Sequence, residues 1–256
     1  MLYLFIALTA SIIGAISGLG GGVIIKPILD AIGHYDITTI NLLSSFTVLS
    51  MAVASTMRHY QAKTVFDQSM TPLLIIGSIV GAMLGDSLLT KAIEYAHYPQ
   101  QVKQLQNILL LILLSIVLLY INYFNKKFQF HMKHRGFILF IGLSLGFIST
   151  LLGIGGGPIN IMALTLFFAL PAKDASINSL ILILFSQASK IFNVFLNHDL
   201  LSYDLSMLLY MIPGGIIGGL LGSKLNHRLS SQMVKAAFNL VLLFTMMTTL
   251  YNICIS

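Results

Sequence analysis

The sequence predicts an all-α polytopic membrane protein built from two tandem four-segment repeats. Three observations lead to this fold class. The chain is 57% hydrophobic and only 9% charged, whereas soluble domains carry roughly 25% charged residues. Apolar runs of about 20 residues, the length that crosses a bilayer, recur along the whole chain. A glycine-rich motif also opens each half, as GLGGG at 18–22 and as GIGGGP at 153–158.

Eight apolar segments follow one another along the chain. They lie at 2–32, 37–57, 69–90, 104–124, 136–170, 174–197, 205–225 and 236–255. The hydrophilic stretch NKKFQFHMKHR separates the first four from the last four. We therefore expect a first transmembrane repeat at 1–124, a basic linker at 125–135 and a second transmembrane repeat at 136–256. The first segment lacks the basic start of a signal peptide, so we expect it to be retained.

Two offsets relate the halves residue by residue. At an offset of 135, Gly18, Gly20, Gly21 and Gly22 map onto Gly153, Gly155, Gly156 and Gly157. At an offset of 137, Asn41, Asp67, Gly77, Gly81 and Gly85 map onto Asn178, Asp204, Gly214, Gly218 and Gly222. Glycines four residues apart let two helices approach closely in lipid, so we expect the glycines of this second set to serve packing. The two aspartates precede apolar segments, where a carboxylate caps free N–H groups.

The consecutive glycines predict a break in the first and fifth segments. Each glycine costs a helix interior about 1 kcal/mol relative to alanine. A nucleotide phosphate loop is excluded because the pattern GxxxxGK[ST] is missing, while close helix packing stays open. Pro158 favours a second half-helix that starts at the glycines. A broken membrane helix is tolerated where its backbone is buried in protein or lines a cavity, and its free N–H groups attract anions.

The basic residues favour re-entrant rather than crossing first and fifth segments. If all eight segments crossed, the 14 Lys and Arg would divide evenly between the two sides. If these two segments enter and return on one side, ten lie on the side of the linker, which the positive-inside rule makes cytoplasmic. The ten are Arg58, Lys63, Lys126, Lys127, Lys133, Arg135, Lys173, Lys224, Arg228 and Lys235. We therefore expect inverted repeats with both termini outside.

Polar residues predict a pocket next to the breaks. Segment two carries Asn41, Ser45, Ser55 and His59, and segment six carries Asn178, Ser186, Ser189, Asn193 and Asn197 along one helical face. Such stripes face the bundle interior or water, and helix-to-helix hydrogen bonding is the alternative. The candidate substrate-binding residues are Gly20, Gly21, Gly22, Val23, Asn41, Ser45, Gly155, Gly156, Gly157, Ile159, Asn178 and Lys190.

Few ionisable residues lie inside the apolar segments. Lys26 and Lys190 either face the pocket or extend to the membrane surface. His59 is expected at the interface rather than in a proton pathway. Asp86 is the one plausible buried carboxylate, so the carboxylate chain of a cation-coupled pump is missing.

The two glycine motifs, each opening half of an eight-segment chain, resemble the TauE/SafE family along the whole sequence. The resemblance implies a transporter of the bacterial inner membrane that moves sulfite or an organosulfur anion such as sulfoacetate. It identifies the family better than the substrate. The first motif departs from the second, because Val23 stands where the second has Pro158.

We therefore expect an exporter or facilitator for a small anion, embedded in the lipid bilayer. No cofactor, metal or nucleic acid is expected, and whether the chain forms a homodimer is open. The patterns HExxH and GxSxG are missing, which argues against an enzyme. An accessory subunit without transport of its own and a cation transporter are the alternatives.

Overall fold

The computed structural model describes residues 1–61, 70–95, 99–125, 127–197 and 203–255. These residues form ten α-helices and one short π-helix, with no strand among them. The predicted all-α class is therefore confirmed for the described part of the chain. Lys63, Asp67 and Lys126, which entered the repeat and charge comparisons, lie outside the described residues.

The helices follow the predicted segments in order. The first half contains α1 (Leu2–Ser17), α2 (Gly22–Ile32), α3 (Ile37–Gln61), α4 (Thr71–Tyr95), α5 (Pro99–Leu119) and the π-helix η1 (Tyr120–Phe124). The second half contains α6 (Arg135–Leu152), α7 (Gly157–Phe168), α8 (Ala172–Asn197), α9 (Leu208–Arg228) and α10 (Ser231–Ile255). The first and fifth predicted segments are thus each divided into two helices at their glycines.

Seven helices of the described chain are long and apolar enough to cross a membrane. They are α3, α4, α5 continued by η1, α6, α8, α9 and α10. At 1.5 Å per residue, α1 and α7 span only about 24 Å and 18 Å, less than the roughly 30 Å of a bilayer's hydrocarbon core. The chain is therefore a multi-pass membrane protein in which three helices, α1, α7 and the 11-residue α2, are too short to cross alone.

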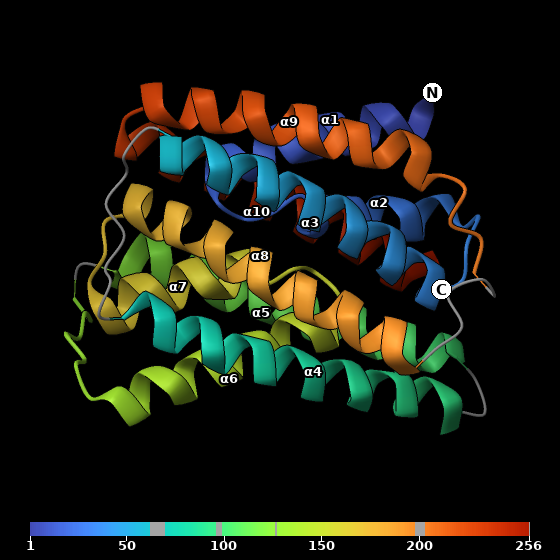
Figure 1. Ribbon diagram of the computed structural model, residues 1–256, viewed down its shortest axis with the longest axis horizontal. Coiled ribbons are helices and arrows are strands. Elements are labelled where there is room, and N and C mark those ends of the chain that lie inside the picture. The colour runs from blue at the N-terminus through green and yellow to red at the C-terminus, as the bar shows by residue number, and fades with distance from the viewer. Residues whose placement is uncertain (62–69, 96–98, 126, 198–202, 256) are drawn as a thin grey trace.

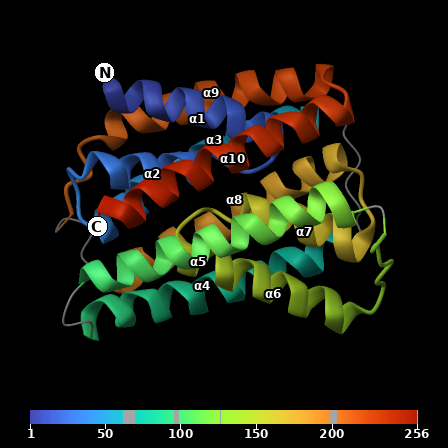
Figure 2. The ribbon, with the colours of Figure 1, turned by 180° about the vertical axis from the view of Figure 1, so that it is seen from behind.

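The two broken pairs return to the end of the molecule from which they start. Figure 1 places both termini at one end of the bundle and the segment between α5 and α6 at the other, and Figure 2 shows the same from behind. We call these the terminal end and the linker end. At the terminal end, the Tyr3 hydroxyl lies 2.9 Å from His34 Nδ1, which joins the start of α1 to the end of α2. At the linker end, the backbone N–H of Phe130 donates to the Leu166 carbonyl of α7 at 2.7 Å.

Glycines hold two pairs of helices in close contact. Gly77, Gly81 and Gly85 of α4 face the backbone of α6, and Gly214, Gly218 and Gly222 of α9 face the backbone of α1. A β-carbon at Gly81 would overlap the Leu143 carbonyl, and one at Gly218 would lie 2.7 Å from the Leu8 carbonyl oxygen. Any larger residue at these positions would separate the helices.

The predicted cap at Asp204 takes a different form. Its Oδ1 accepts a hydrogen bond from the backbone N–H of Ser206 at 3.1 Å, before α9 begins at Leu208. Hydrogen bonds from the side chain and backbone of Ser206 hold the pKa of this exposed carboxyl below its ordinary value. The carboxylate therefore orders the turn that leads into α9 rather than the first turn of the helix.

Candidate functional site

The two breaks share one backbone conformation at their first glycines. Gly18 and Gly20 have φ of 73° and 75°, and their counterparts Gly153 and Gly155 have φ of 68° and 75°. This left-handed region strains every residue except glycine. The breaks differ at the third glycine, because Gly156 has φ of 87° whereas Gly21 is right-handed at −63°. Pro158 lies in the first turn of α7, as predicted.

The two breaks contact each other in the buried centre of the molecule. A β-carbon at Gly157 would overlap the backbone of Leu19, and one at Gly22 would lie 3.0 Å from the Ile154 carbonyl oxygen. Leu19 and Ile154 are both fully buried. Consecutive glycines therefore permit the close approach of two chain segments in addition to the left-handed turns.

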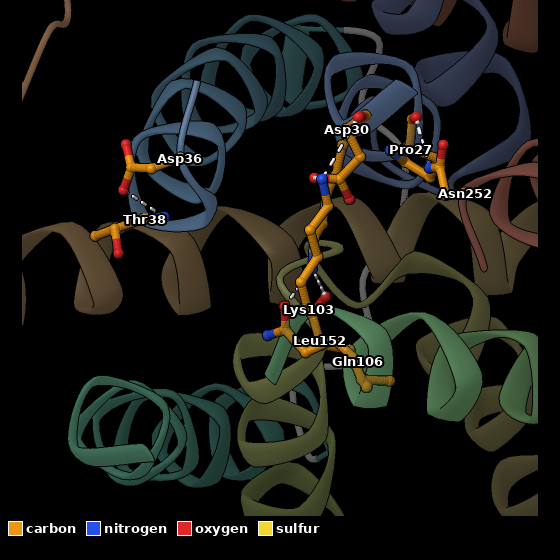
Figure 3. Close-up of polar contacts among 9 residues, drawn as sticks. Pro27, Asp30, Asp36, Thr38, Lys103, Gln106, Leu152 and Asn252 are labelled. Atoms are coloured by element: carbon orange, nitrogen blue, oxygen red, sulfur yellow. Dashed lines mark hydrogen bonds and ion pairs between the residues drawn. The ribbon is translucent and has the colours of Figure 1, made fainter. Parts of the chain in front are cut away.

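Buried polar side chains satisfy the last carbonyls of α1 and α6. Lys26 Nζ donates to the Leu152 carbonyl and to Gln106 Oε1, both at 2.8 Å, and Gln106 Nε2 donates to the Leu151 carbonyl. Figure 3 shows Gln106 of α5 beside Leu152. At the other break, Asn226 Nδ2 donates to the Ile16 carbonyl at 2.6 Å. These hydrogen bonds supply partners to carbonyls at the ends of α1 and α6, which have no partner within their own helix.

Lys26 thus has a structural role that sequence reasoning did not consider. Only 1% of its surface is exposed, so it does not extend to the membrane surface. Its ammonium lies at the C-terminal end of α6, where the helix dipole favours a positive charge.

Asp86 is not the only buried carboxylate, which corrects the prediction. Asp30 of α2 is 6% exposed, and its Oδ1 lies 3.4 Å from Lys103 Nζ of α5; Figure 3 shows this pair between the two helices. Sequence reasoning overlooked Asp30 because α2 is mostly apolar. Its partner Lys103 lies on another helix, 73 residues further along the chain.

A small cavity lies between α3, α4 and α8 at the terminal end. Its volume is about 100 Å³, the space of roughly three water molecules. Its lining residues are Thr38, Asn41, Leu42, Asp86, Leu89, Thr90, Ile93, Glu94, Lys190, Val194 and Tyr203. It therefore combines one buried cation, one buried anion and one buried amide with apolar walls.

Lys190 and Asp86 are each held by a neutral partner. Lys190 Nζ donates to Ser45 Oγ at 2.8 Å, and Asp86 Oδ2 accepts from Asn193 Nδ2 at 2.8 Å. Both side chains are 3% exposed, so Lys190 does not extend to the membrane surface. An ammonium has three N–H donors, and the bond to Ser45 uses one of them.

Asn41 stands out because its amide is buried without a protein partner. The residue is 4% exposed, and neither its Oδ1 nor its Nδ2 has a hydrogen-bond partner in the described chain. Leaving a buried polar group unpaired costs about 1–3 kcal/mol. The amide oxygen also occupies the space where a β-carbon at Gly153 would lie. Asn41 therefore connects the cavity to the second break and offers a donor and an acceptor to a ligand.

An apolar cluster lies on the linker-end side of Ser45 and Lys190. In the direction of the linker end, Val48 lies one turn from Ser45 on α3, and Ile183 lies two turns from Lys190 on α8. Val48 is 1% exposed and Ile183 is 0% exposed. A β-carbon at Gly20 would lie 3.1 Å from Ile183 Cδ1, and one at Gly155 would lie 3.3 Å from Val48 Cγ1. Both breaks thus pack against this cluster, which we call the apolar plug.

The structure brings together three of the predicted site residues, Asn41, Ser45 and Lys190. Gly20 and Gly155 contact the plug, whereas Gly21 packs against Ser11 and Gly156 against Ser149. Gly22, Gly157, Val23 and Ile159 are buried among the two breaks and the core. The cavity lining includes none of these break residues, so the break backbone lies one layer deeper than the polar side chains.

Asn178 lies apart from the cavity. Its Nδ2 donates to the Asp174 carbonyl at 2.9 Å, and its Oδ1 accepts from Thr71 Oγ1 at 3.3 Å. His59, expected at the interface, is 1% exposed, with its ring centroid 4.6 Å from that of His227. The side chain of Asn197 lies outside the described residues.

Sequence reasoning missed Gln106 and Asn226, which bind the ends of the broken helices. Gln106 lies in an apolar segment and Asn226 directly follows one, and polar residues at such positions usually face the protein interior. That signal was present in the sequence but did not indicate which carbonyl each amide would reach.

Comparison with protein families gives one match. The family model described as sulfite exporter TauE/SafE covers residues 3–249, nearly the whole chain. Comparisons with curated proteins and with solved structures give no match.

Proposed function

Because the chain belongs to the sulfite exporter TauE/SafE family, we propose that it moves a small sulfur oxyanion through the cavity between α3, α4 and α8. This family is one of membrane transporters, which is consistent with the expectation that the chain is not an enzyme. The substrate proposed here is sulfite or a short organosulfonate. Asn41, Ser45 and Lys190 are its principal side-chain ligands.

The observation that carries this proposal is the pairing of a buried ammonium with an unpartnered amide. Lys190 keeps two N–H donors beyond its bond to Ser45, and Asn41 Nδ2 adds further donors. An oxyanion presents several acceptors and one or two negative charges, so it can satisfy both groups. Asp86 and Glu94 line the same cavity, and their negative charges oppose the anion. We therefore expect weak binding, which suits a transporter because the substrate must leave again.

The cavity size favours the smallest substrates. Sulfite has four heavy atoms and fits a space of about three water molecules. A sulfonate with a carbon chain would require side chains such as Leu42 or Leu89 to move. Sulfite is therefore the first choice and sulfoacetate the second.

We propose that the path of the anion continues from the cavity to the glycine breaks. If the apolar plug opens, the anion reaches the region where the helices α2 and α7 begin. Neither helix has a side-chain cap at its start, so first-turn N–H groups in Gly20–Val23 and Gly155–Ile159 are available to an anion. The exceptions are Gly20, whose N–H donates to the Gly14 carbonyl, and Pro158, which has no N–H. In this proposal Val48 and Ile183 form a gate between two aqueous approaches.

We further propose an inverted repeat with two re-entrant pairs. In support, Gly77, Gly81 and Gly85 face Leu139, Leu143 and Phe147, whereas Gly214, Gly218 and Gly222 face Leu4, Leu8 and Ile12. The two contact sets are related by offsets of 137 and 135. On this proposal the repeats are intertwined, the linker is cytoplasmic, both termini are outside, and the membrane is the inner membrane of a bacterium.

A cation transporter is the second candidate, because Asp86 shares the cavity with Lys190. An accessory subunit is disfavoured, since packing alone gives no reason to bury Lys190 and leave Asn41 unpaired. The test is a flux assay with the purified protein in liposomes, loaded in turn with sulfite, thiosulfate, sulfoacetate, sulfate, Na⁺ or K⁺. We expect sulfite to move fastest and both cations to stay. Movement of a cation without any of the anions would replace this function by the second candidate.

A further inference from the structure

A second polar pocket lies at the linker end, far from the cavity described above. It has a volume of about 410 Å³ and is lined by Arg58 and Gln61 of the end of α3 and by Lys224, His227 and Arg228 of the end of α9. Three of the five side chains carry a fixed positive charge, and among the residues that the structure describes no acidic one lines the pocket. Such a site attracts an anionic group.

The fold holds these cations in place. Lys173 Nζ donates to the carbonyls of His227 and Leu229 at 3.2 Å and 2.9 Å, which fixes the last turn of α9. The His227 ring packs on the ring of His59, which is 1% exposed. The pocket is therefore built on ordered backbone rather than on a loop.

An apolar groove adjoins the basic pocket. It has a volume of about 540 Å³, runs between α3 and α9, and shares Arg58 and Gln61 with the pocket. Its walls include Val53, Met57, Ile216 and Leu220, whose surfaces are 41%, 58%, 42% and 43% exposed. These side chains are exposed on helices that are long and apolar enough to cross the membrane, so the groove faces lipid.

Glycines create the groove. A β-carbon at Gly215 would lie 2.8 Å from the Thr47 carbonyl oxygen, and one at Gly219 would lie 2.6 Å from that of Met51. The two helices therefore nearly touch along these glycines, and the larger flanking side chains rise on either side as walls.

We propose that this surface binds an anionic phospholipid, with its phosphate between Arg58, Lys224 and Arg228 and one acyl chain in the groove. Basic residues beside a membrane-facing groove fit such a headgroup, because guanidinium and ammonium groups donate to phosphate oxygens. A soluble anion would use the basic pocket alone and gain nothing from the groove. The bound lipid joins the linker-end halves of α3 and α9, and α3 also carries Val48 of the apolar plug.

The experiment is native mass spectrometry of the full chain in detergent with phosphatidylglycerol or with phosphatidylcholine of the same acyl chains. We expect the wild type to retain phosphatidylglycerol selectively. Each basic residue near a membrane surface is worth about 1 kcal/mol, so Arg58→Gln/Lys224→Gln/Arg228→Gln should weaken its binding about 100-fold. The matched control Lys127→Gln/Lys133→Gln/Arg135→Gln removes the same charge at the same end and should retain the lipid.

A groove variant separates a phospholipid from a free anion. Val53→Trp fills the groove and should weaken phosphatidylglycerol binding, whereas Ile116→Trp, on the exposed face of α5, should not. If the triple variant unfolds, Lys224→Gln/Arg228→Gln, which changes only exposed side chains, takes its place. Equal binding of the two lipids, or equal loss in the control triple variant, overturns the proposal. Displacement of the lipid by inorganic phosphate together with normal binding by Val53→Trp would assign the pocket to a soluble anion instead.

Discussion

Replacing Lys190 by glutamine should weaken substrate binding more than any other single change in the cavity. The ammonium of Lys190 is 3% exposed and donates one hydrogen bond, to Ser45 at 2.8 Å. Glutamine keeps two N–H donors on a side chain one bond shorter than that of lysine, and it removes the positive charge. The change therefore tests whether the cavity recognises an anion by charge.

The expected magnitude follows from the two ways in which an ammonium acts on an anion. Two unit charges 4 Å apart interact by about 4 kcal/mol at the effective dielectric constant of 20 found near protein surfaces, before desolvation is subtracted. A hydrogen bond to a charged group contributes about 1.5–3 kcal/mol net. Taking the net figure, KM for sulfite should rise roughly 10- to 150-fold.

The assay is the initial rate of sulfite flux in proteoliposomes as a function of sulfite concentration. Lys91→Gln is the matched control. Lys91 is an exposed cation of α4 at the terminal end, where the cavity also lies, and the KM of this variant should stay at the wild-type value. Lys190→Arg should retain most of the affinity. Lys190→Gln leaves the buried Asp86 without a nearby cation, which destabilises the fold. The double variant Lys190→Gln/Asp86→Asn removes both charges, so it separates a loss of flux from a loss of folding. An unchanged KM in a folded Lys190→Gln protein would refute anion recognition by this cavity.

Three further predictions concern the breaks, the plug and the topology. Gly157→Ala should prevent normal folding, because its β-carbon would overlap the backbone of Leu19. The control Gly33→Ala, where φ is 71° but the space is open, should lower the free energy of unfolding by only about 1–2 kcal/mol. Equal losses of stability in thermal unfolding would contradict the contact between the two breaks. Val48→Ala should raise passive sulfite leak severalfold by thinning the plug, whereas a leak as low as wild type would show that the gate lies elsewhere. Reporter fusions should place both termini outside and the 125–135 linker in the cytoplasm, and a C-terminal reporter active only in the cytoplasm would contradict the re-entrant pairs.

The sequence predicted the helical architecture because the relevant signals are local. Apolar runs set the helix positions, and consecutive glycines marked the two breaks, whose left-handed turns at Gly18, Gly20, Gly153 and Gly155 few other residues could adopt. The spacing of Gly77, Gly81 and Gly85 predicted close packing, which the structure places on α6. The sequence could not identify that partner, because spacing within one helix carries no information about the helix it meets.

The candidate site was predicted only in part, since it depends on contacts between distant segments. Asn41, Ser45 and Lys190 were named from polarity inside apolar runs, and they meet at one cavity. Asn178 was named for its equivalence to Asn41, yet its amide is satisfied by Asp174 and Thr71. Repetition in sequence therefore did not give two equal sites. Asp86 has no charged counterpart at Ser223, which is the residue 137 positions later.

The membrane potential offers the most direct test of the central claim, that this chain carries a small sulfur anion through the Lys190 cavity. The measurement is sulfite efflux from proteoliposomes under a potassium-diffusion potential of either sign. A monovalent anion gains about 2.3 kcal/mol per 100 mV on leaving an inside-negative compartment, enough for roughly a fifty-fold gradient. We expect an inside-negative potential to accelerate efflux, an inside-positive potential to slow it, and Lys190→Gln to remove most of the flux. A rate that ignores the sign of the potential would contradict electrogenic anion passage, and a failure of sulfite to move while Na⁺ or K⁺ does would contradict anion transport itself.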